Sequence, residues 1–409
     1  MGGVSDDVLV ARAFLNRVCE PAWIPTWSAV RELGPVATAQ ALRSGRLSGS
    51  DFAAAVARAA HADPYADLES AQRHGVRLVT PESDEWPHFA FAALEAAGLR
   101  RLEAWHKGSK FHDERGELIP PLALWVRGTL DLATVGVRSV AIVGSRASTE
   151  YGNWVARDWA ERLSEREFVV VSGGAHGIDA AAHRGALSAD GQTVLVSAGG
   201  LDRAYPPANA QLFERVAENG LLVSESPPGA DPRRRRFLTR NRLIAALGTG
   251  TVVVEAASRS GARNTAGHCT GLGRPLMAVP GPITSERSAG CHELIAADQD
   301  PARLVASVED VLEVIGGASD VTAIRPPAER ASEDLTRRLD SLDPAARQVF
   351  DALPARAWVG PDRLALASGL SPLTVIRTLP ALELAGLVES SVEGYRVARK
   401  PRARAGAPP

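Results

Sequence analysis

Cysteine is scarce in this 409-residue sequence, which contains only Cys19, Cys269 and Cys291. Three widely spaced cysteines predict no disulfide framework, and no CxxC pair offers the spacing of a metal site. A run of about 18 apolar residues, long enough to span a membrane, is also lacking. The N-terminus has no basic region followed by an apolar segment, as a signal peptide would. These absences predict a protein of the reducing cytoplasm that is neither exported nor embedded in a membrane.

An excess of charge of either sign is lacking as well. Lys and Arg nearly balance Asp and Glu, so the formal net charge is −2 and the pI is about 6.5. This balance excludes a uniformly basic nucleic-acid coat and leaves room for one concentrated basic patch. The apolar fraction of 45% is ample for a core, and the length predicts two or three domains.

The first 138 residues divide into a helical part and an irregular part. Apolar positions recur every three or four residues through residues 1–75, which predicts a small helical domain. Gly34-Pro35 joins two of its helices, as in a SAM or helix-hairpin-helix element, so this domain either only packs or holds a DNA phosphate on its backbone amides. Prolines break the pattern in residues 76–138, which we expect to be a connection with a surface insertion at 93–118.

The segment 139–315 has the pattern of a parallel sheet, because short apolar runs each end in Gly or Ser and precede a helical stretch. These runs are SVAIVGS, FVVVSGG, TVLVSAGG, LLVSE, TVVVEAA and PLMAVPG. Continuous hydrophobicity predicts strands buried on both faces, hence an α/β fold with an extended Rossmann-like, doubly wound, mostly parallel sheet. Residues 316–338, rich in Gly, Pro and polar side chains, predict a linker. Residues 339–400 show three helices and a two-stranded wing, the order of a winged-helix domain.

Two loops that follow strands of this sheet are suited to an anion. Parallel strands bring such loops to one edge of the sheet, where ligands bind. The first loop holds Ser145 and Arg146, and the second holds Ser172, Gly173 and Gly174, whose amides an anion can approach closely. Neither loop reads GxGxxG or GxxxxGK[ST], so neither a dinucleotide cofactor nor a nucleoside triphosphate is expected.

Basic charge is concentrated between residues 231 and 242, where six arginines face one acid, Asp231, for a local charge of +5. The six are Arg233, Arg234, Arg235, Arg236, Arg240 and Arg242. The first four form either a solvated surface or part of an anion site. We expect Arg240, Asn241 and Arg242 to precede an apolar helix, with at least one arginine pointing along the ligand edge of the sheet.

No catalytic or metal centre is indicated. Asp179 and His183 stand one helical turn apart, and an acid near a helix start that bonds the imidazole is the more common explanation of such a pair. Glu255 ends a strand without a paired carboxylate, a serine-histidine-acid set or a cysteine with a nearby base. The pairs His268-Cys269 and Cys291-His292 suggest zinc by composition alone. We therefore expect neither catalysis nor a bound metal or cofactor.

Seven motifs follow one another through the central segment. They are VAIVGSR with Tyr151-Gly152, VVSGGAHGIDAAAH, GGLDRAYPPAN, LLVSESPPG, FLTRNRLIAAL, VVVEAASRSG and AVPGPI. In this order they resemble the DNA-processing protein A family, also called DprA/Smf, and the resemblance spans nearly the whole chain. It implies an extended Rossmann fold that binds single-stranded DNA without sequence preference. It also implies a homodimer that hands the strand to the RecA recombinase during natural transformation, and no catalysis.

The DNA pocket of that family falls on residues that the loops already indicate. These are Ser145, Arg146, Ser172, Gly173, Gly174, Arg240, Asn241 and Arg242. Arg236 and Phe237 adjoin them, and Phe237 either stacks on a base or sits in the core. Where the family usually reads SGSLIT, this sequence reads SGARNT, so Arg263 is a further candidate phosphate contact. The family proline after Phe237 is here Leu238, which bears on how the following loop is presented.

Three functions draw on the same cationic edge. The first is non-catalytic single-strand binding with recombination mediation, which we expect. The second is a Rossmann-like nucleotide phosphoribohydrolase, whose PGGxGTxxE signature is met here only by LGTGTVVVEAA, without Pro-Gly-Gly. The third is a transcription regulator that reads duplex DNA through the C-terminal domain. The recognition helix of that domain offers only Arg377 as a cation and contains Pro380, which favours a protein contact over groove reading.

Overall fold

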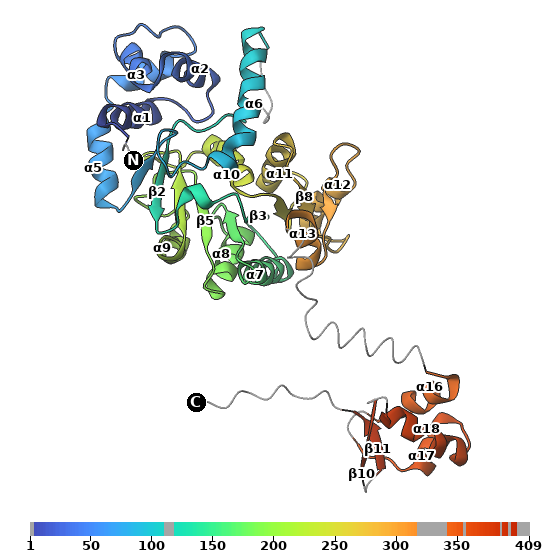
Figure 1. Cartoon of the computed structure of the whole chain (residues 1–409). Coiled ribbons are helices and arrows are strands. Elements are labelled where there is room, and N and C mark those ends of the chain that lie inside the picture. Colours follow the sequence, from blue (N-terminus) through green and yellow to red (C-terminus); the bar gives the residue numbers. More distant parts are fainter. Residues whose placement is uncertain are drawn as a thin grey trace. The chain divides into compact units, whose positions relative to one another are not determined.

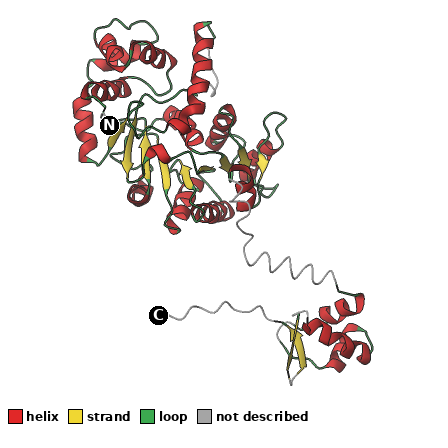
Figure 2. Ribbon diagram, in the orientation of Figure 1, coloured by secondary structure: helices red, strands yellow, loops and turns green. Residues whose placement is uncertain are grey.

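The computed structural model describes residues 4–109, 118–316, 342–354, 357–384, 387–391 and 394–398. The chain forms two compact units, residues 1–322 and 323–409 (Figure 1). Nearly all of the expected linker at 316–338, and residues 110–117 of the expected insertion, lie outside the described residues. Figure 2 shows the helices and strands of both units.

Five helices open the first unit, as the apolar spacing predicts. They are α1 (Asp6–Val18), α2 (Ile24–Leu33), α3 (Pro35–Arg43), α4 (Ala53–Ala59) and α5 (Pro64–Arg73). Gly34, between α2 and α3, has a φ of 80°, which glycine adopts without strain. Asp63 caps α5 by accepting hydrogen bonds from the amides of Tyr65 and Ala66, both at 3.0 Å.

A nine-stranded sheet lies at the centre of this unit, with the strand order β1-β2-β6-β5-β4-β3-β7-β8-β9. The strands are β1 (Arg77–Val79), β2 (Leu124–Gly128), β3 (Ser139–Val143), β4 (Val169–Ser172), β5 (Thr193–Ser197), β6 (Leu221–Ser224), β7 (Thr251–Val253), β8 (Leu276–Ala278) and β9 (Arg303–Leu304). Strands β3 to β9 pair in parallel, whereas β1 and β2 add antiparallel. The six apolar runs form β3 to β8, so the expected doubly wound, mostly parallel sheet is confirmed.

Helices cover both faces of the sheet (Figure 1). Successive strand residues point to opposite faces, so Ala141 and Val143 of β3 enter one core while Val140 and Ile142 enter another. The first core includes α6 (His88–His106), α10 (Arg234–Leu247), α11 (Gly261–Gly271) and α12 (Glu286–Ile295). The second includes α7 (Glu150–Ser164), α8 (Ile178–Ser188) and α13 (Val308–Ile315), and α9 (Ala210–Asn219) packs on the same face beside α8. The described residues of this unit also include two short 3-10 turns, η2 (Leu132–Thr134) and η3 (Pro207–Asn209).

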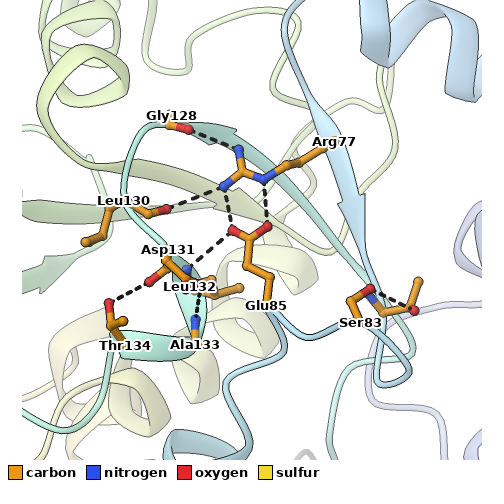
Figure 3. A network of polar contacts seen from close by, with 10 residues as sticks. Arg77, Ser83, Glu85, Gly128, Leu130, Asp131, Leu132, Ala133 and Thr134 are labelled. Carbon is orange, nitrogen blue, oxygen red and sulfur yellow. Dashed lines mark hydrogen bonds and ion pairs between the residues drawn. The ribbon is translucent and has the colours of Figure 1, made fainter. Parts of the chain in front are cut away.

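The segment 76–138 belongs to the sheet and is not a mere connection, which corrects the expectation. β1 pairs with β2 and β2 with β6, and the 19-residue α6 covers much of the expected insertion at 93–118. Figure 3 shows the polar network that fixes β1 against the end of β2. Arg77 donates to both carboxylate oxygens of Glu85, at 2.7 and 2.5 Å, and to the carbonyl oxygen of Gly128 at 3.0 Å. β1 has only three residues and β2 only five, so neither strand is long enough to show a clear apolar pattern in the sequence.

Two of the N-terminal helices, α1 and α5, share a core with the sheet. Trp125 of β2 is fully buried in a cluster that includes Ala13 of α1 and Ala71 of α5. Its indole nitrogen donates to the side-chain oxygen of Asn16 at 2.7 Å. The helices of residues 4–75 therefore belong to the same compact unit as the sheet.

The second unit has the order that its sequence predicts. Its elements are α16 (Pro344–Asp351), α17 (Pro361–Ser368), α18 (Pro372–Leu384) and the antiparallel pair β10 (Val388–Ser391) and β11 (Gly394–Val397). Val349, Leu364 and Val375 are fully buried in its core. Three helices followed by a two-stranded wing confirm the winged-helix architecture. Within the described ranges, no single helix is long and apolar enough to cross a membrane, and α17 and α18 pass that test only as a pair bent by 105°.

Candidate nucleic-acid interface

The strand order places a cleft at the carboxyl edge of the sheet. The chain runs from β3 through β4 and β5 to β6, and then returns to add β7 on the other side of β3. Ligands of open α/β sheets bind at such a reversal, because the loops after the two neighbouring strands diverge. A cleft of about 1080 Å³ lies here, between the loop after β3, the loop after β7 and helix α10.

Positive charge dominates the lining of this cleft. Among the described residues, five arginines line it, namely Arg146, Arg234, Arg240, Arg259 and Arg263, against a single acid, Asp179. The sequence leaves the role of Arg234 open, and it offers no signal for Arg259 beyond its place in the loop after β7. The basic patch that the sequence predicts is therefore present, but its arginines come from three segments: the loop after β3, helix α10, and the loop after β7 with the start of α11.

Ser145 and Arg146 lie in the cleft wall, as the sequence predicts. The carbonyl oxygen of Ser145 accepts a hydrogen bond from the amide of Ile178 at 3.2 Å, which ties the loop after β3 to the start of α8. Gly177 has a φ of 75°, and a side chain there would collide with the carbonyl oxygen of Ser145, so this contact requires glycine. Arg146 is exposed, and its guanidinium carbon lies 5.0 Å from the centre of the Phe237 ring.

Glu255 holds the same loop from the neighbouring strand. Its two carboxylate oxygens accept hydrogen bonds from the amide of Thr149 at 2.9 Å and from the Thr149 hydroxyl at 2.5 Å. The Thr149 hydroxyl oxygen also accepts from the amide of Gly152 at 3.1 Å and so caps α7. Glu255 is only 3% exposed. The hydrogen bonds of Glu255 therefore link the loop after β3 to the segment that follows β7.

Ser172, Gly173 and Gly174 lie behind the cleft wall, which corrects the expectation for these three residues. All three residues are buried, and none of them lines the cleft. The Ser172 hydroxyl donates to the carbonyl oxygen of Ile142 at 2.6 Å. The carbonyl oxygen of Gly173 accepts from the guanidinium of Arg240 at 2.7 Å. The Gly173 carbonyl therefore positions an arginine of the cleft, and Ala175 is the residue of this loop that lines the cleft.

Arg240 is the most enclosed of the five arginines, with an exposed fraction of 6%. Its guanidinium also donates to the carbonyl oxygen of Val196. Burial lowers the pKa of Arg240 to about 10, so the side chain stays charged at neutral pH. Burial raises the pKa of the neighbouring Asp179, against the opposing effect of the charges on Arg240 and Arg146. A permanent cation is thus fixed at the inner end of the cleft.

Arg240, Asn241 and Arg242 lie inside α10 and not in a loop before it. The helix begins at Arg234, so Leu238 falls in its second turn. A proline at that position would remove a hydrogen bond to the carbonyl four residues back. The expectation of a loop is wrong because arginine favours a helix as readily as the apolar residues that follow.

Arg242 points away from the cleft, which corrects its expected role as a phosphate contact. It is fully buried, and its guanidinium binds both carboxylate oxygens of Glu225, one of them at 2.7 Å. Its Nε donates to the carbonyl oxygen of Ile119 at 2.9 Å. Residues two apart on a helix point in nearly opposite directions, so Arg240 and Arg242 cannot both face the cleft.

Asn241 reaches the cleft between these two arginines. Its side-chain nitrogen donates to the side-chain oxygen of Asn264 at 2.9 Å and to the carbonyl oxygen of Gly261 at 3.3 Å. Asn264 also lines the cleft, and its own amide nitrogen is buried without a hydrogen-bond partner. The pair joins α10 to the start of α11. Asn264 is a site residue that the sequence did not single out.

Phe237 lines the cleft beside a second aromatic ring. The centres of the Phe237 and Tyr205 rings are 5.5 Å apart, and the guanidinium carbons of Arg146 and Arg240 lie 5.0 and 6.0 Å from the Phe237 ring centre. Tyr205 is 48% exposed. It belongs to the motif GGLDRAYPPAN, but its spacing does not place it in the cleft. Aromatic faces next to cations suit a nucleobase that is attached to a phosphate.

Arg236 and Arg263 have different surroundings. Arg236 lies 3.5 Å from the carboxylate of Glu20 and does not line the cleft, which corrects its expected place. Arg263 does line the cleft, at the start of α11, and binds the carboxylate of Glu293. The Glu293 carboxylate therefore partly neutralises the positive charge of Arg263, and the spacing of the two residues in the sequence does not indicate this pairing.

Most of the residues considered for catalysis or metal binding are buried. The His183 ring contacts the Thr193 hydroxyl at 2.8 Å, and burial lowers the pKa of His183 to about 3. Burial raises the pKa of the Cys269 thiol to about 11 and that of Cys291 to about 12. Across the part of the chain that the structure describes, no group of three or more His, Cys, Asp or Glu side chains could hold a metal ion.

Known proteins resemble the chain over nearly its whole length. The model of the DNA recombination-mediator protein A family matches residues 115–316, and that of the DprA winged helix domain matches residues 326–394. A putative DNA processing protein DprA from Mycobacterium tuberculosis is 43% identical over 403 residues, which cover 98% of this chain and 97% of the relative. The X-ray structure of DprA from Streptococcus pneumoniae is 28% identical, with a TM-score of 0.59 over 77% of this chain and 99% of its own.

Proposed function

The chain belongs to the DNA recombination-mediator protein A family, and we propose that it binds single-stranded DNA without sequence preference in the cleft between β3, β7 and α10. We further propose that it acts in the cytoplasm as a homodimer, passes the strand to RecA during natural transformation and catalyses no reaction. One observation supports the binding above all others: five arginines line the cleft together with Phe237 and Tyr205.

Arginines at the sheet edge suit a partner of any sequence, because every nucleotide carries the same phosphate. Four or five phosphate contacts to a single strand predict a log–log salt slope of about −3 to −3.5. Stacking on Phe237 or Tyr205 adds about 1 to 3 kcal/mol per base. In a duplex the base faces are already stacked on each other, so we expect the single strand to bind more tightly.

Fluorescence anisotropy with a labelled oligonucleotide of mixed sequence tests this proposal, as single strand and as duplex, over a series of salt concentrations. Arg146→Ala and Arg234→Ala should each flatten the salt slope for the single strand by about 0.7. Arg215→Ala is the control, because this exposed arginine of α9 does not line the cleft. Wild-type slopes in both cleft variants, or equal affinity for duplex, would contradict the proposed site.

The absence of catalysis is supported by the surroundings of two carboxylates, Asp179 in the cleft lining and Glu255 beside the loop after β3. Thr149 occupies both oxygens of Glu255, and Asp179 is buried close to Arg240. A nucleotide phosphoribohydrolase, the competing function, would release a free base from a nucleoside monophosphate. Chromatography after incubation with each common nucleoside monophosphate should detect no base, and its release would overturn this part of the proposal.

Transfer to RecA and the homodimer are supported by membership of the family. RecA-dependent ATP hydrolysis on single strands coated with single-strand-binding protein should begin sooner when this protein is added. Arg146→Ala should lose that effect together with its DNA affinity. Sedimentation equilibrium should give twice the chain mass, and a monomer at micromolar concentration would refute the homodimer.

A further inference from the structure

We infer that a bound single strand leaves the cleft past Arg146 and enters a second groove between α7 and α8, where Arg157 and Arg184 hold two further phosphates. This inference rests on the proposed single-strand binding and extends it to a longer stretch of DNA. The groove has a volume of about 350 Å³. It shares Arg146 and Ala147 with the cleft, so the two hollows adjoin at the loop after β3.

The contact between α7 and α8 brings the two arginines to one groove. A side chain at Gly185 of α8 would collide with the carbonyl oxygen of Arg157, so the helix backbones touch at this point. Arg184 is next to Gly185 in the chain, and both Arg157 and Arg184 line the groove. They come from different helices, and their separation in sequence hides this arrangement.

Both arginines carry charge that no acid in the described ranges offsets. Arg157 and Arg184 are exposed, and neither has a carboxylate within ion-pair distance among the residues described. Arg162, on the same helix as Arg157, differs because it binds Glu309 at 2.7 Å and Asp158 at 3.8 Å. Cations left unpaired beside Arg146 repel each other, and an anionic polymer that crosses the groove removes this repulsion.

The groove predicts a dependence on DNA length. An oligonucleotide of about 6 nucleotides fits within the cleft, whereas one of about 16 also reaches the groove, both within the range of known single-strand sites. Two additional phosphate contacts should make the salt slope of the wild-type protein steeper by about 1.4 on the longer strand. Arg157→Ala/Arg184→Ala should abolish this difference and leave the slope on the shorter strand unchanged.

Anisotropy titrations of both lengths with the full chain test the inference. Arg157→Lys/Arg184→Lys, which keeps the charge, should retain the steeper slope, and Arg215→Ala should behave as the wild type. A wild-type slope on the longer strand in the alanine variant would show that these arginines are merely a solvated surface. An equal loss on both lengths would also overturn the inference, because the groove would then not be a separate extension. If the wild type binds neither strand, the proposed function fails as well, which sets that result apart.

Discussion

Replacement of Arg242 separates a structural role from a role in DNA binding. Arg242→Met replaces the arginine with an apolar side chain of similar length. It leaves the carboxylate of Glu225, which is 7% exposed, without its cation. An uncompensated buried charge of this kind destabilises a protein by about 3 to 5 kcal/mol. The carbonyl oxygen of Ile119 also loses its donor. We therefore expect the free energy of unfolding of the first unit to fall by about 3 to 5 kcal/mol.

Urea unfolding followed by circular dichroism measures this loss. Arg242→Met/Glu225→Met removes both charges and should recover most of it, because apolar residues of similar volume often replace a buried ion pair at little cost. The affinity for single-stranded DNA, measured where the variants are folded, should equal that of the wild type. A variant as stable as the wild type but with a flatter salt slope would refute the reasoning, since the arginine would then have to reach the DNA.

Three further predictions concern a buried imidazole, a helix contact and the aromatic pair. His183→Gln removes a group whose folded-state pKa, about 3, lies below its ordinary 6.5, so the wild type should lose about 3 kcal/mol more stability than the variant as the pH falls from about 8.5 to about 4.5; parallel stability profiles of the two proteins would contradict this. Gly185→Ala should cost about 1 to 3 kcal/mol in urea unfolding because α7 and α8 must separate, whereas Gly267→Ala, with open space around it within α11, should stabilise by about 0.5 to 1 kcal/mol. Phe237→Ala should weaken single-strand binding by about 1 to 3 kcal/mol for all sequences and Phe237→Trp should not, which anisotropy measures; loss confined to some sequences would argue against stacking.

The strands and the edge of the sheet that carries the cleft could be predicted because their physics is local. A run such as SVAIV has to be buried on both faces, and only a parallel sheet between helices provides that environment. The loop that follows it holds Ser145 and Arg146, and the structure places both in the cleft wall. Strand identity and loop position follow from the same few residues.

The direction of individual side chains could not be predicted, because it depends on partners far along the chain. Arg240 and Arg242 look alike in the sequence, yet one lines the cleft and the other is paired with Glu225, 17 residues away. Arg263 is likewise partly offset by Glu293, 30 residues away. Tyr205 joins the cleft only because the chain between β5 and β6 returns beside Phe237. Composition locates the basic charge, but only packing decides which arginines a ligand can reach.

Trp125 limits how the protein can be dissected. Its indole is fully buried in a core to which α1, α5, α9 and the sheet contribute. Truncation before residue 76 would leave an aromatic surface against water and an indole nitrogen without its acceptor, so a shortened chain should aggregate. A fragment designed to crystallise or to isolate the cleft must therefore retain α1 and α5, and it can end at the boundary of the first compact unit.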